Sequence, residues 1–312
     1  MPRPVRSLAA LAIFAVAIVA AALARAANIA LAPPAPTVNQ APPQAGCAAR
    51  PTGPYAVPKS FTKDTVTVEC SDGYRMTGDL IRRVRSRGAM PGVIYLHEDG
   101  KDRHIWHAQS VFTAARQMIS LAVDLRGYGE NPGTVGNPAK TASAFTDTEY
   151  RLMLEDVRDA VSFMAIKPEV EGGKLGIVGA DMGANLALLA ASAPWGEAIR
   201  VVVAVSPSLE WKGLSVRDAI ARIPKSTHVY LAAAKDDPAS WEACQVIMGL
   251  LKGPKDFFQA DTGGHGSRVF QGHSFHQIPT WLSSNLVESR APGGPPGSPP
   301  VRRLPAPARP AR

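Results

Sequence analysis

Apolar runs of strand length alternate with helical patterns through most of the chain. Between two of these runs, Tyr150, Leu154, Val157, Val161 and Met164 recur at spacings of four, three, four and three, which places them on one face of a helix. Continuous apolar strands separated by helices predict a parallel sheet covered on both faces. The runs are GVIYLH (92–97), MISLAVDL (118–125), KLGIVGA (174–180), RVVVAVS (200–206), HVYLAAA (228–234) and DFFQA (256–260).

Two further strand-like segments precede these runs. DTVTVEC (64–70) and YRMTGDLIRRV (74–84) flank a Ser71-Asp72-Gly73 turn and predict a hairpin, which adds an antiparallel edge. We therefore expect one α/β domain over residues 61–290, with a mostly parallel sheet of about eight strands and helices on both faces. No insertion is long enough for a large cap domain.

The two ends of the chain differ from this domain in composition. Residues 1–26 have the layout of a secretory signal peptide that is cleaved after Ala26. They contain the basic segment MPRPVR, an apolar run of 17 residues (8–24) and the cleavage site Ala24-Arg25-Ala26. The expected location is periplasmic or secreted; the alternative is an uncleaved N-terminal membrane anchor, for which the run is slightly short. Residues 27–60 and 291–312 are rich in proline and predict extended, poorly ordered segments.

The formal net charge of +8 is concentrated in these ends. Residues 1–60 and 288–312 hold ten basic residues and one acidic residue, which leaves 24 of the 34 basic and 25 of the 26 acidic residues in 61–287. A nearly neutral domain argues against nucleic acid as a partner. For the basic tails we expect at most a weak contact with an anionic envelope surface, and the sequence does not indicate an oligomeric state.

The chain has three cysteines, Cys47, Cys70 and Cys244. An oxidising compartment permits a Cys47–Cys70 disulfide, and three unpaired cysteines are the alternative. No pair has metal-ligand spacing, so the sequence implies neither a metal nor a cofactor.

GIVGADMGANLALLA (176–190) predicts a strand, a glycine-framed turn and a helix. The pattern is that of a nucleophile elbow, with Asp181 where serine is usual. An elbow residue has a strained backbone, so the residues two before and two after it must be small, and Gly179 and Gly183 meet that need. The N–H of Met182, at the start of the helix, is a candidate oxyanion donor.

Partners for such a nucleophile follow it along the chain. Asp237, which ends the strand HVYLAAA before a proline, is the expected orienting acid, with Asp236 as the fallback. His265, in the glycine loop after the last strand, is the expected base. After GVIYLH, the N–H of Asp99 is the second candidate oxyanion donor, and the neighbouring Glu98 is a candidate modulator.

Five stretches of the chain carry a family resemblance, in this order: IYLHEDGKDRHIW, AVDLRGYGENP, IVGADMGANLAL, AAAKDDP and GGHG. Together they resemble the α/β-hydrolase superfamily and, within it, the dienelactone-hydrolase-like and small esterase branch. The resemblance covers roughly residues 64–287 and implies an α/β-hydrolase fold and hydrolysis of an ester, lactone or related small substrate. This branch carries serine or cysteine at the elbow, where this chain has Asp181. An elbow aspartate resembles haloalkane dehalogenases and epoxide hydrolases, but their tryptophan after the nucleophile is Met182 here, and their H-G-x-P motif is HEDG.

Three interpretations follow. The first is an exported hydrolase with an Asp181–His265–Asp237 triad, acting on an ester or lactone or by haloalkane- or epoxide-type chemistry. The second is a catalytically inactive binding protein, and the third is an envelope-associated domain whose tails carry the function. A Glu98 that points at Asp181 would share a proton with it and prevent its attack.

Overall fold

The computed structural model describes residues 55–86, 88–131 and 133–287. The predicted signal peptide, nearly all of the proline-rich leader, the tail and Cys47 lie outside these residues. Cys70 and Cys244 are buried and form no disulfide with any described residue. Export and the Cys47–Cys70 pairing therefore stay predictions.

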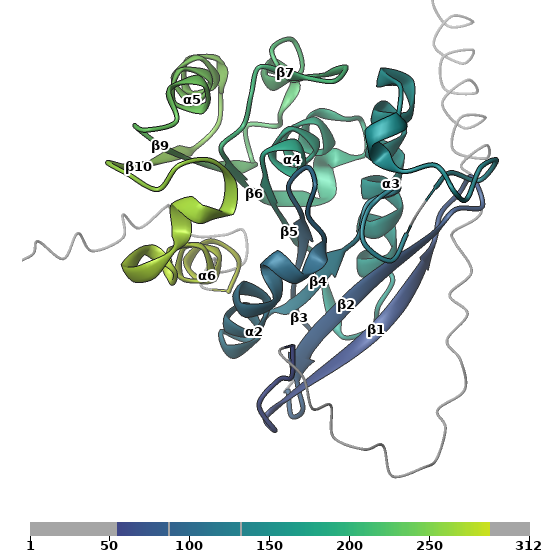
Figure 1. The fold of residues 1–312 in the computed structure, drawn as a ribbon. Helices are drawn as coiled ribbons and strands as arrows, with labels where there is room; N and C mark the ends of the chain where they lie inside the picture. Colours follow the sequence, from purple (N-terminus) through teal and green to yellow (C-terminus); the bar gives the residue numbers. More distant parts are fainter. Residues whose placement is uncertain (1–54, 87, 132, 288–312) are drawn as a thin grey trace, which may run out of the picture.

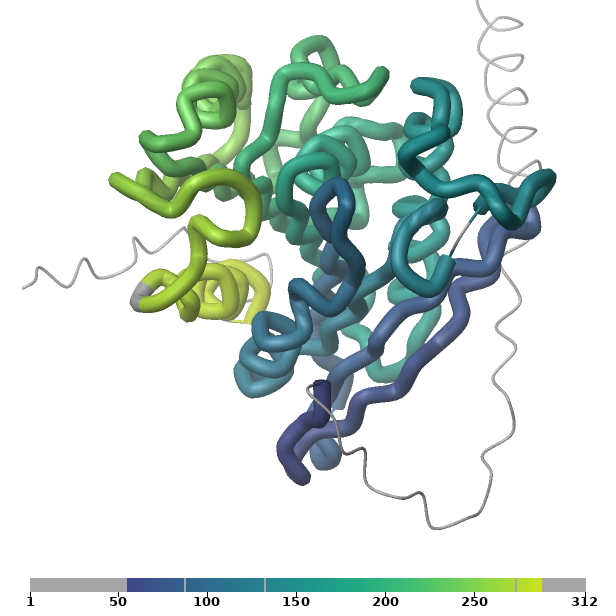
Figure 2. The backbone as a smooth tube through the Cα atoms, viewed as in Figure 1, coloured from purple at the N-terminus to yellow at the C-terminus, as the bar shows by residue number. Residues whose placement is uncertain are grey.

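An eight-stranded sheet runs through the middle of the domain (Figure 1). Its order is β1-β2-β4-β3-β5-β6-β9-β10; β1 pairs antiparallel with β2, β2 pairs antiparallel with β4, and the remaining neighbours are parallel. This confirms the predicted mostly parallel sheet of eight strands with an antiparallel hairpin at one edge, which is the long pair of strands early in the chain in Figure 2. The strands are β1 (Phe61–Glu69), β2 (Arg75–Arg83), β3 (Met90–Leu96), β4 (Ile119–Val123), β5 (Val170–Ala180), β6 (Ile199–Val205), β9 (His228–Ala234) and β10 (Lys255–Ala260).

Helices cover both faces of the sheet. In Figure 1, α2 and α6 lie together on one side, and α3, α4 and α5 lie on the other. No helix in the described ranges is both long and apolar enough to cross a membrane. The α-helices are α2 (His107–Ala115), α3 (Asp147–Ala165), α4 (Met182–Ser192), α5 (Pro238–Leu250) and α6 (Gln277–Leu282); short 3-10 turns are Arg103–Trp106, Ala142–Ala144, Gly196–Ala198, Ile220–Arg222, Gly266–Phe270 and Gly272–Ser274, and Ser283–Val287 is a π-helical turn.

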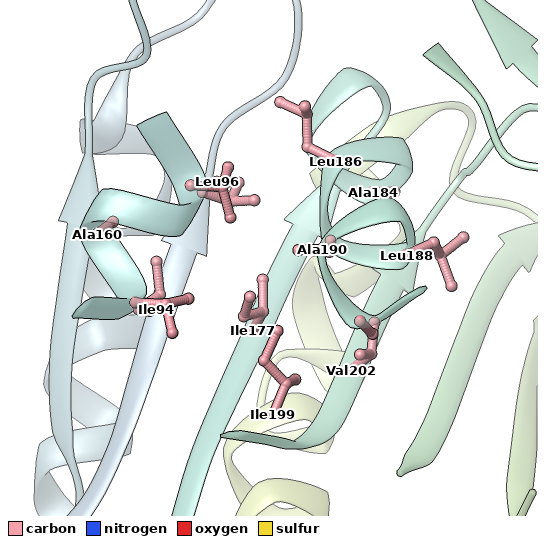
Figure 3. Close-up of a cluster of buried hydrophobic side chains, with 14 of the residues drawn as sticks. Ile94, Leu96, Ala160, Ile177, Ala184, Leu186, Leu188, Ala190, Ile199 and Val202 are labelled. Atoms are coloured by element: carbon pink, nitrogen blue, oxygen red, sulfur yellow. The ribbon is translucent and has the colours of Figure 1, made fainter. Parts of the chain in front are cut away.

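The larger core lies between the sheet and the α3–α4 side. Within it, Figure 3 shows Ile94 of β3 near Ala160 of α3, and Ile177 of β5 and Val202 of β6 near Ala190 of α4. α4 is almost entirely buried, which explains its continuous apolar sequence. The elbow lies near the centre of the sheet because it follows the inner strand β5. The predicted apolar face of α3 is buried except at Leu154, which is partly buried.

A small hairpin between β6 and β9 has no counterpart in the sequence prediction. It consists of β7 (Glu210–Trp211) and β8 (Leu214–Ser215), joined by Lys212 and Gly213. Strands of two residues are too short to produce a periodic pattern, and for that reason the sequence did not indicate them.

Two buried arginines hold the segment after β4. Arg126 is 1% exposed, and its guanidinium pairs with both carboxylate oxygens of buried Asp156 and with Asp72. The guanidinium of Arg103 pairs with buried Asp124, and the Asp124 carboxylate also accepts a hydrogen bond from the backbone N–H of Arg103. Asp124 and Arg126 belong to the D-L-R-G-Y-G stretch (124–129), so the charged residues of that stretch are used in buried ion pairs and not in the reactive group.

Candidate active site

The elbow forms where the sequence predicts it. Asp181 follows β5 and precedes α4, with φ 52° and ψ −117°, a strained conformation for a residue with a side chain. A Cβ on Gly179 would lie 2.0 Å from the Gly183 carbonyl oxygen, and one on Gly183 would lie 2.5 Å from that of Leu96. Both glycines are therefore required for α4 to pack this closely against β5 and β3.

Asp181, His265 and Asp237 form one continuous chain of contacts. His265 Nε2 lies 3.2 Å from Asp181 Oδ1, and His265 Nδ1 lies 2.7 Å from Asp237 Oδ2. The three side chains come from the ends of β5, β9 and the loop after β10, which meet at the carboxyl edge of the sheet. Asp237 makes this contact with the histidine, and the fallback Asp236 does not.

Asp236 has a different role in the same loop. Its carboxylate accepts hydrogen bonds from the N–H groups of Gly263 and Gly264, at 3.1 and 2.9 Å. Ser206, with φ 49° at the end of β6, accepts from the Gly266 N–H at 3.0 Å. The glycine loop that carries the histidine is thus held on both sides of it. Sequence reasoning missed Ser206, and the only signal for it was a polar residue at the end of an apolar strand.

Glu98, which follows β3, holds the same loop through Ser267. Its Oε1 accepts from the Ser267 N–H at 2.9 Å and from the Ser267 hydroxyl. The expectation that Glu98 points at Asp181 is therefore corrected: its carboxylate turns to the histidine loop, because the two donors of Ser267 stabilise it there.

The backbone of Asp99 faces the elbow while its side chain faces away. Its N–H donates to Asp181 Oδ2 at 3.1 Å. Its carboxylate accepts from the Tyr128 hydroxyl at 2.5 Å and pairs with Lys212 Nζ at 3.2 Å. The Met182 N–H belongs to the first turn of α4, where backbone donors have no intrahelical acceptor. Both predicted oxyanion donors thus lie beside the elbow.

His97 fixes the backbone that precedes Asp99. The ring is fully buried, Nε2 accepts from the Leu125 N–H at 3.0 Å, and Nδ1 lies 2.7 Å from the Glu98 carbonyl oxygen. Burial lowers the pKa of His97, so the neutral ring donates from Nδ1 to that carbonyl. The arrangement sets the path of residues 98 and 99 and is positional rather than catalytic.

The electrostatics of the triad are dominated by its two carboxylates. The hydrogen bond with Asp181 and the contact with Asp237 outweigh burial and raise the pKa of His265 to about 9. Burial of Asp237 is opposed by the Ser240 hydroxyl and by His265, and the net result is a lowered pKa of that carboxyl group. At neutral pH the site therefore holds an imidazolium between two acids.

We expect the titration of His265 to report this arrangement directly. Its ring should titrate near pH 9 in NMR spectra of the protein, and near its ordinary value in Asp181→Asn, which lacks the main cause of the shift. Because the folded pKa is raised, the triad stabilises the fold below about pH 6.5, and this contribution is lost as the pH rises through about 9. A wild-type midpoint below 7 would contradict the ion pair.

A pocket of about 620 Å³ opens beside the histidine. A volume of this size fits a small organic molecule. Of the three triad residues, His265 is the one that lines this pocket, together with charged and polar side chains. The lining residues are Glu98, Lys101, Ile105, His265, Ser267, Arg268 and Gln271. Among the residues that the structure describes, no three His, Cys, Asp or Glu side chains are grouped to hold a metal ion.

Comparison with known proteins identifies the architecture. No protein-family model matches the chain. A polyketide transferase, ATR5, of Stachybotrys chlorohalonatus is 28% identical over 145 residues, which are 42% of this chain and 45% of that protein. The match thus spans less than half of the length of that curated relative.

Solved structures are similar over a larger part of the chain. Acetyl xylan esterase 1 from Thermoanaerobacterium sp. JW/SL YS485 has a TM-score of 0.61 at 15% identity, over 74% of this chain and 85% of that chain. A dienelactone hydrolase from Anabaena variabilis has a TM-score of 0.56 at 15% identity, over 73% and 98%. An esterase from Pyrococcus furiosus has 0.57 at 18% identity, over 73% and 93%. With the sheet order and the elbow described above, these similarities establish that the chain has the α/β-hydrolase fold.

Proposed function

We propose that the protein is an exported hydrolase that cleaves an ester, a lactone or a related small substrate with Asp181 as nucleophile. The observation that carries the proposal is the unbroken chain Asp181–His265–Asp237, with contacts of 3.2 and 2.7 Å, whose histidine lines a 620 Å³ pocket. The names of the structural neighbours, an acetyl xylan esterase and a dienelactone hydrolase, support the ester and lactone class.

In the first step, the ionised Asp181 carboxylate attacks the electrophilic carbon of the substrate. The bond from that carbon to the leaving oxygen breaks, and its electron pair goes to the oxygen. His265 starts as the imidazolium, because its pKa is about 9, and gives its Nε2 proton to the leaving group. Asp181 is then a neutral ester or anhydride, and His265 is neutral.

In the second step, His265 acts as the base. Once Asp181 is esterified, the ring lacks the carboxylate that most stabilised its protonated form. The neutral His265 can then accept a proton from water. Hydroxide adds to the covalent intermediate, the bond to Asp181 breaks, and the imidazolium and the Asp181 carboxylate are restored. Asp237 keeps the ring oriented through Nδ1 in both steps.

One observation supports haloalkane- or epoxide-type chemistry as the second candidate. The Asp99 N–H donates to an oxygen of Asp181 itself, so it would stabilise an oxyanion that forms when water opens an alkyl ester at the Asp181 carbonyl carbon. Attack on a saturated carbon produces such an ester. The two chemistries differ in which carbonyl water attacks, and they use the same triad.

Turnover of a defined panel tests the proposal. The protein is incubated with activated esters, lactones, haloalkanes and epoxides, and hydrolysis is followed by release of acid. We expect hydrolysis of at least one class. Binding of panel compounds, seen as raised thermal stability without any hydrolysis, would favour the inactive binding protein instead.

A further inference from the structure

Lys212 occupies an unusual backbone position close to the elbow. It and Gly213 form the two-residue loop of the β7–β8 hairpin, with φ 42° and 79°. Positive φ at both loop residues is the geometry of a turn that asparagine and glycine prefer, so a lysine in the first position is strained. The turn directs the Lys212 side chain toward Asp99 and Tyr150.

The Lys212 ammonium group lies among three side chains, two of them from distant parts of the chain and the third from the neighbouring residue of the same hairpin. It is 3.2 Å from Asp99 Oδ2 and 2.9 Å from the Tyr150 hydroxyl, and it lies 4.4 Å from the centroid of the Trp211 ring. The Tyr150 hydroxyl in turn donates to the Ala142 carbonyl oxygen at 2.7 Å. A cation with an anionic, a hydroxyl and an aromatic partner is held in one place despite its flexible side chain.

The hairpin itself is attached to the helix of the nucleophile. Asn185 of α4 is fully buried; its amide group donates to the Leu214 carbonyl oxygen at 3.1 Å, and its oxygen accepts from the Ser208 N–H at 3.0 Å. The path from the elbow helix through the hairpin to Asp99 is therefore continuous. Residues far apart in the sequence meet here, since Lys212 and Asp99 are 113 positions apart.

An aspartate is an unfavourable residue at this point of the loop. Its N–H faces Asp181 Oδ2, but its own carboxylate, if left unpaired, would repel the negative charge of the Asp181 nucleophile. We propose that Lys212 is a positioning residue of the hydrolytic reaction: it neutralises the Asp99 carboxylate and holds it away from the elbow, so that the Asp99 N–H stays directed at Asp181. This inference rests on the proposed function.

The test compares Lys212→Met in two backgrounds. Complete loss of an oxyanion donor costs about 10²–10³ in kcat. In Lys212→Met the Asp99 N–H stays in place but is less firmly held, and its carboxylate is no longer neutralised, so kcat should fall roughly tenfold with KM little changed. In the Asp99→Asn background no carboxylate is left to neutralise, so the same replacement should cost no more than about twofold. Lys212→Arg keeps the charge and should restore most of the activity. Lys174→Met, which breaks a surface pair with Glu171 at the start of β5, is the control.

A second readout does not depend on a substrate. The amide proton of Asp99 bonds a carboxylate, so its NMR signal should move upfield and exchange faster in Lys212→Met, and neither change should occur in Lys174→Met or Lys212→Arg. An equal loss of kcat in both backgrounds, or an unchanged Asp99 amide, would overturn the inference. The Asp99 amide signal can be measured even if no substrate is found. Failure of the inference about Lys212 can therefore be distinguished from failure of the proposed function.

Discussion

Replacing Asp181 with asparagine is expected to lower turnover by roughly 10⁴–10⁶-fold, the loss typical of removing a nucleophile. Asparagine keeps the shape of the side chain and tolerates a positive φ, so the elbow should still form. What is lost is the negative oxygen that attacks the substrate and pairs with His265. The measurement is kcat on the substrate class found in the panel, with thermal unfolding to verify the fold.

A matched control exists on the same edge of the sheet. Asp261 is exposed and pairs with Lys235, so Asp261→Asn should leave kcat within about twofold. Full activity in Asp181→Asn would show that another group attacks the substrate. Conversely, Asp181→Ser should gain activity on activated esters if the rest of the site is intact, since His265 and the Asp99 N–H are already in place.

Replacing Arg126 with methionine is expected to destabilise the fold by about 3–5 kcal/mol. The guanidinium is 1% exposed and Asp156 is fully buried, so the variant leaves a carboxylate without its main partner in the core. Burial already raises the pKa of Asp156 against the opposing effect of Arg126, and loss of the guanidinium should raise it further, so the loss of stability should shrink as the pH falls and the carboxyl group takes up a proton. Urea unfolding at several pH values measures both effects.

Arg82→Met is the matched control for this prediction. Arg82 pairs with Asp64 on the exposed β1–β2 edge, where an ion pair contributes less than about 1 kcal/mol. The double variant Arg126→Met with Asp156→Leu should recover part of the stability, because it removes the buried charge. If Arg126→Met lowered the free energy of unfolding no more than Arg82→Met does, the prediction for the buried Arg126–Asp156 pair would be contradicted.

The sheet was predictable because each strand carries a local signal. Five buried strands contain continuous apolar runs, the edge strand β10 is only partly buried, and the β1–β2 hairpin has a turn of Ser71, Asp72 and Gly73. The order of the candidate triad along the chain was predictable for the same reason, since each member ends or follows a strand. Strand ends of a parallel sheet meet at one edge, so Asp181, Asp237 and His265 could be expected together.

The supporting contacts were not predictable, because they depend on side-chain direction and on distant loops. Glu98 follows a strand in the same way as the triad acids do, yet its carboxylate turns to Ser267, which is 169 positions away. The β7–β8 hairpin has no periodicity, so neither Lys212 nor its contact with Asp99 could be inferred. Asp237 contacts His265 whereas Asp236 contacts the glycine loop, a difference in direction between adjacent residues that the sequence does not resolve.

The central claim is that Asp181 forms a covalent bond with the substrate, and intact-mass analysis of His265→Gln tests it most directly. Glutamine cannot accept a proton from water, so the second step should stop, while activated substrates with good leaving groups need no acid in the first. The account predicts a stoichiometric adduct that maps to Asp181 after proteolysis and is absent in His265→Gln with Asp181→Asn. An adduct at another residue, or turnover by His265→Gln at the wild-type rate, would contradict it.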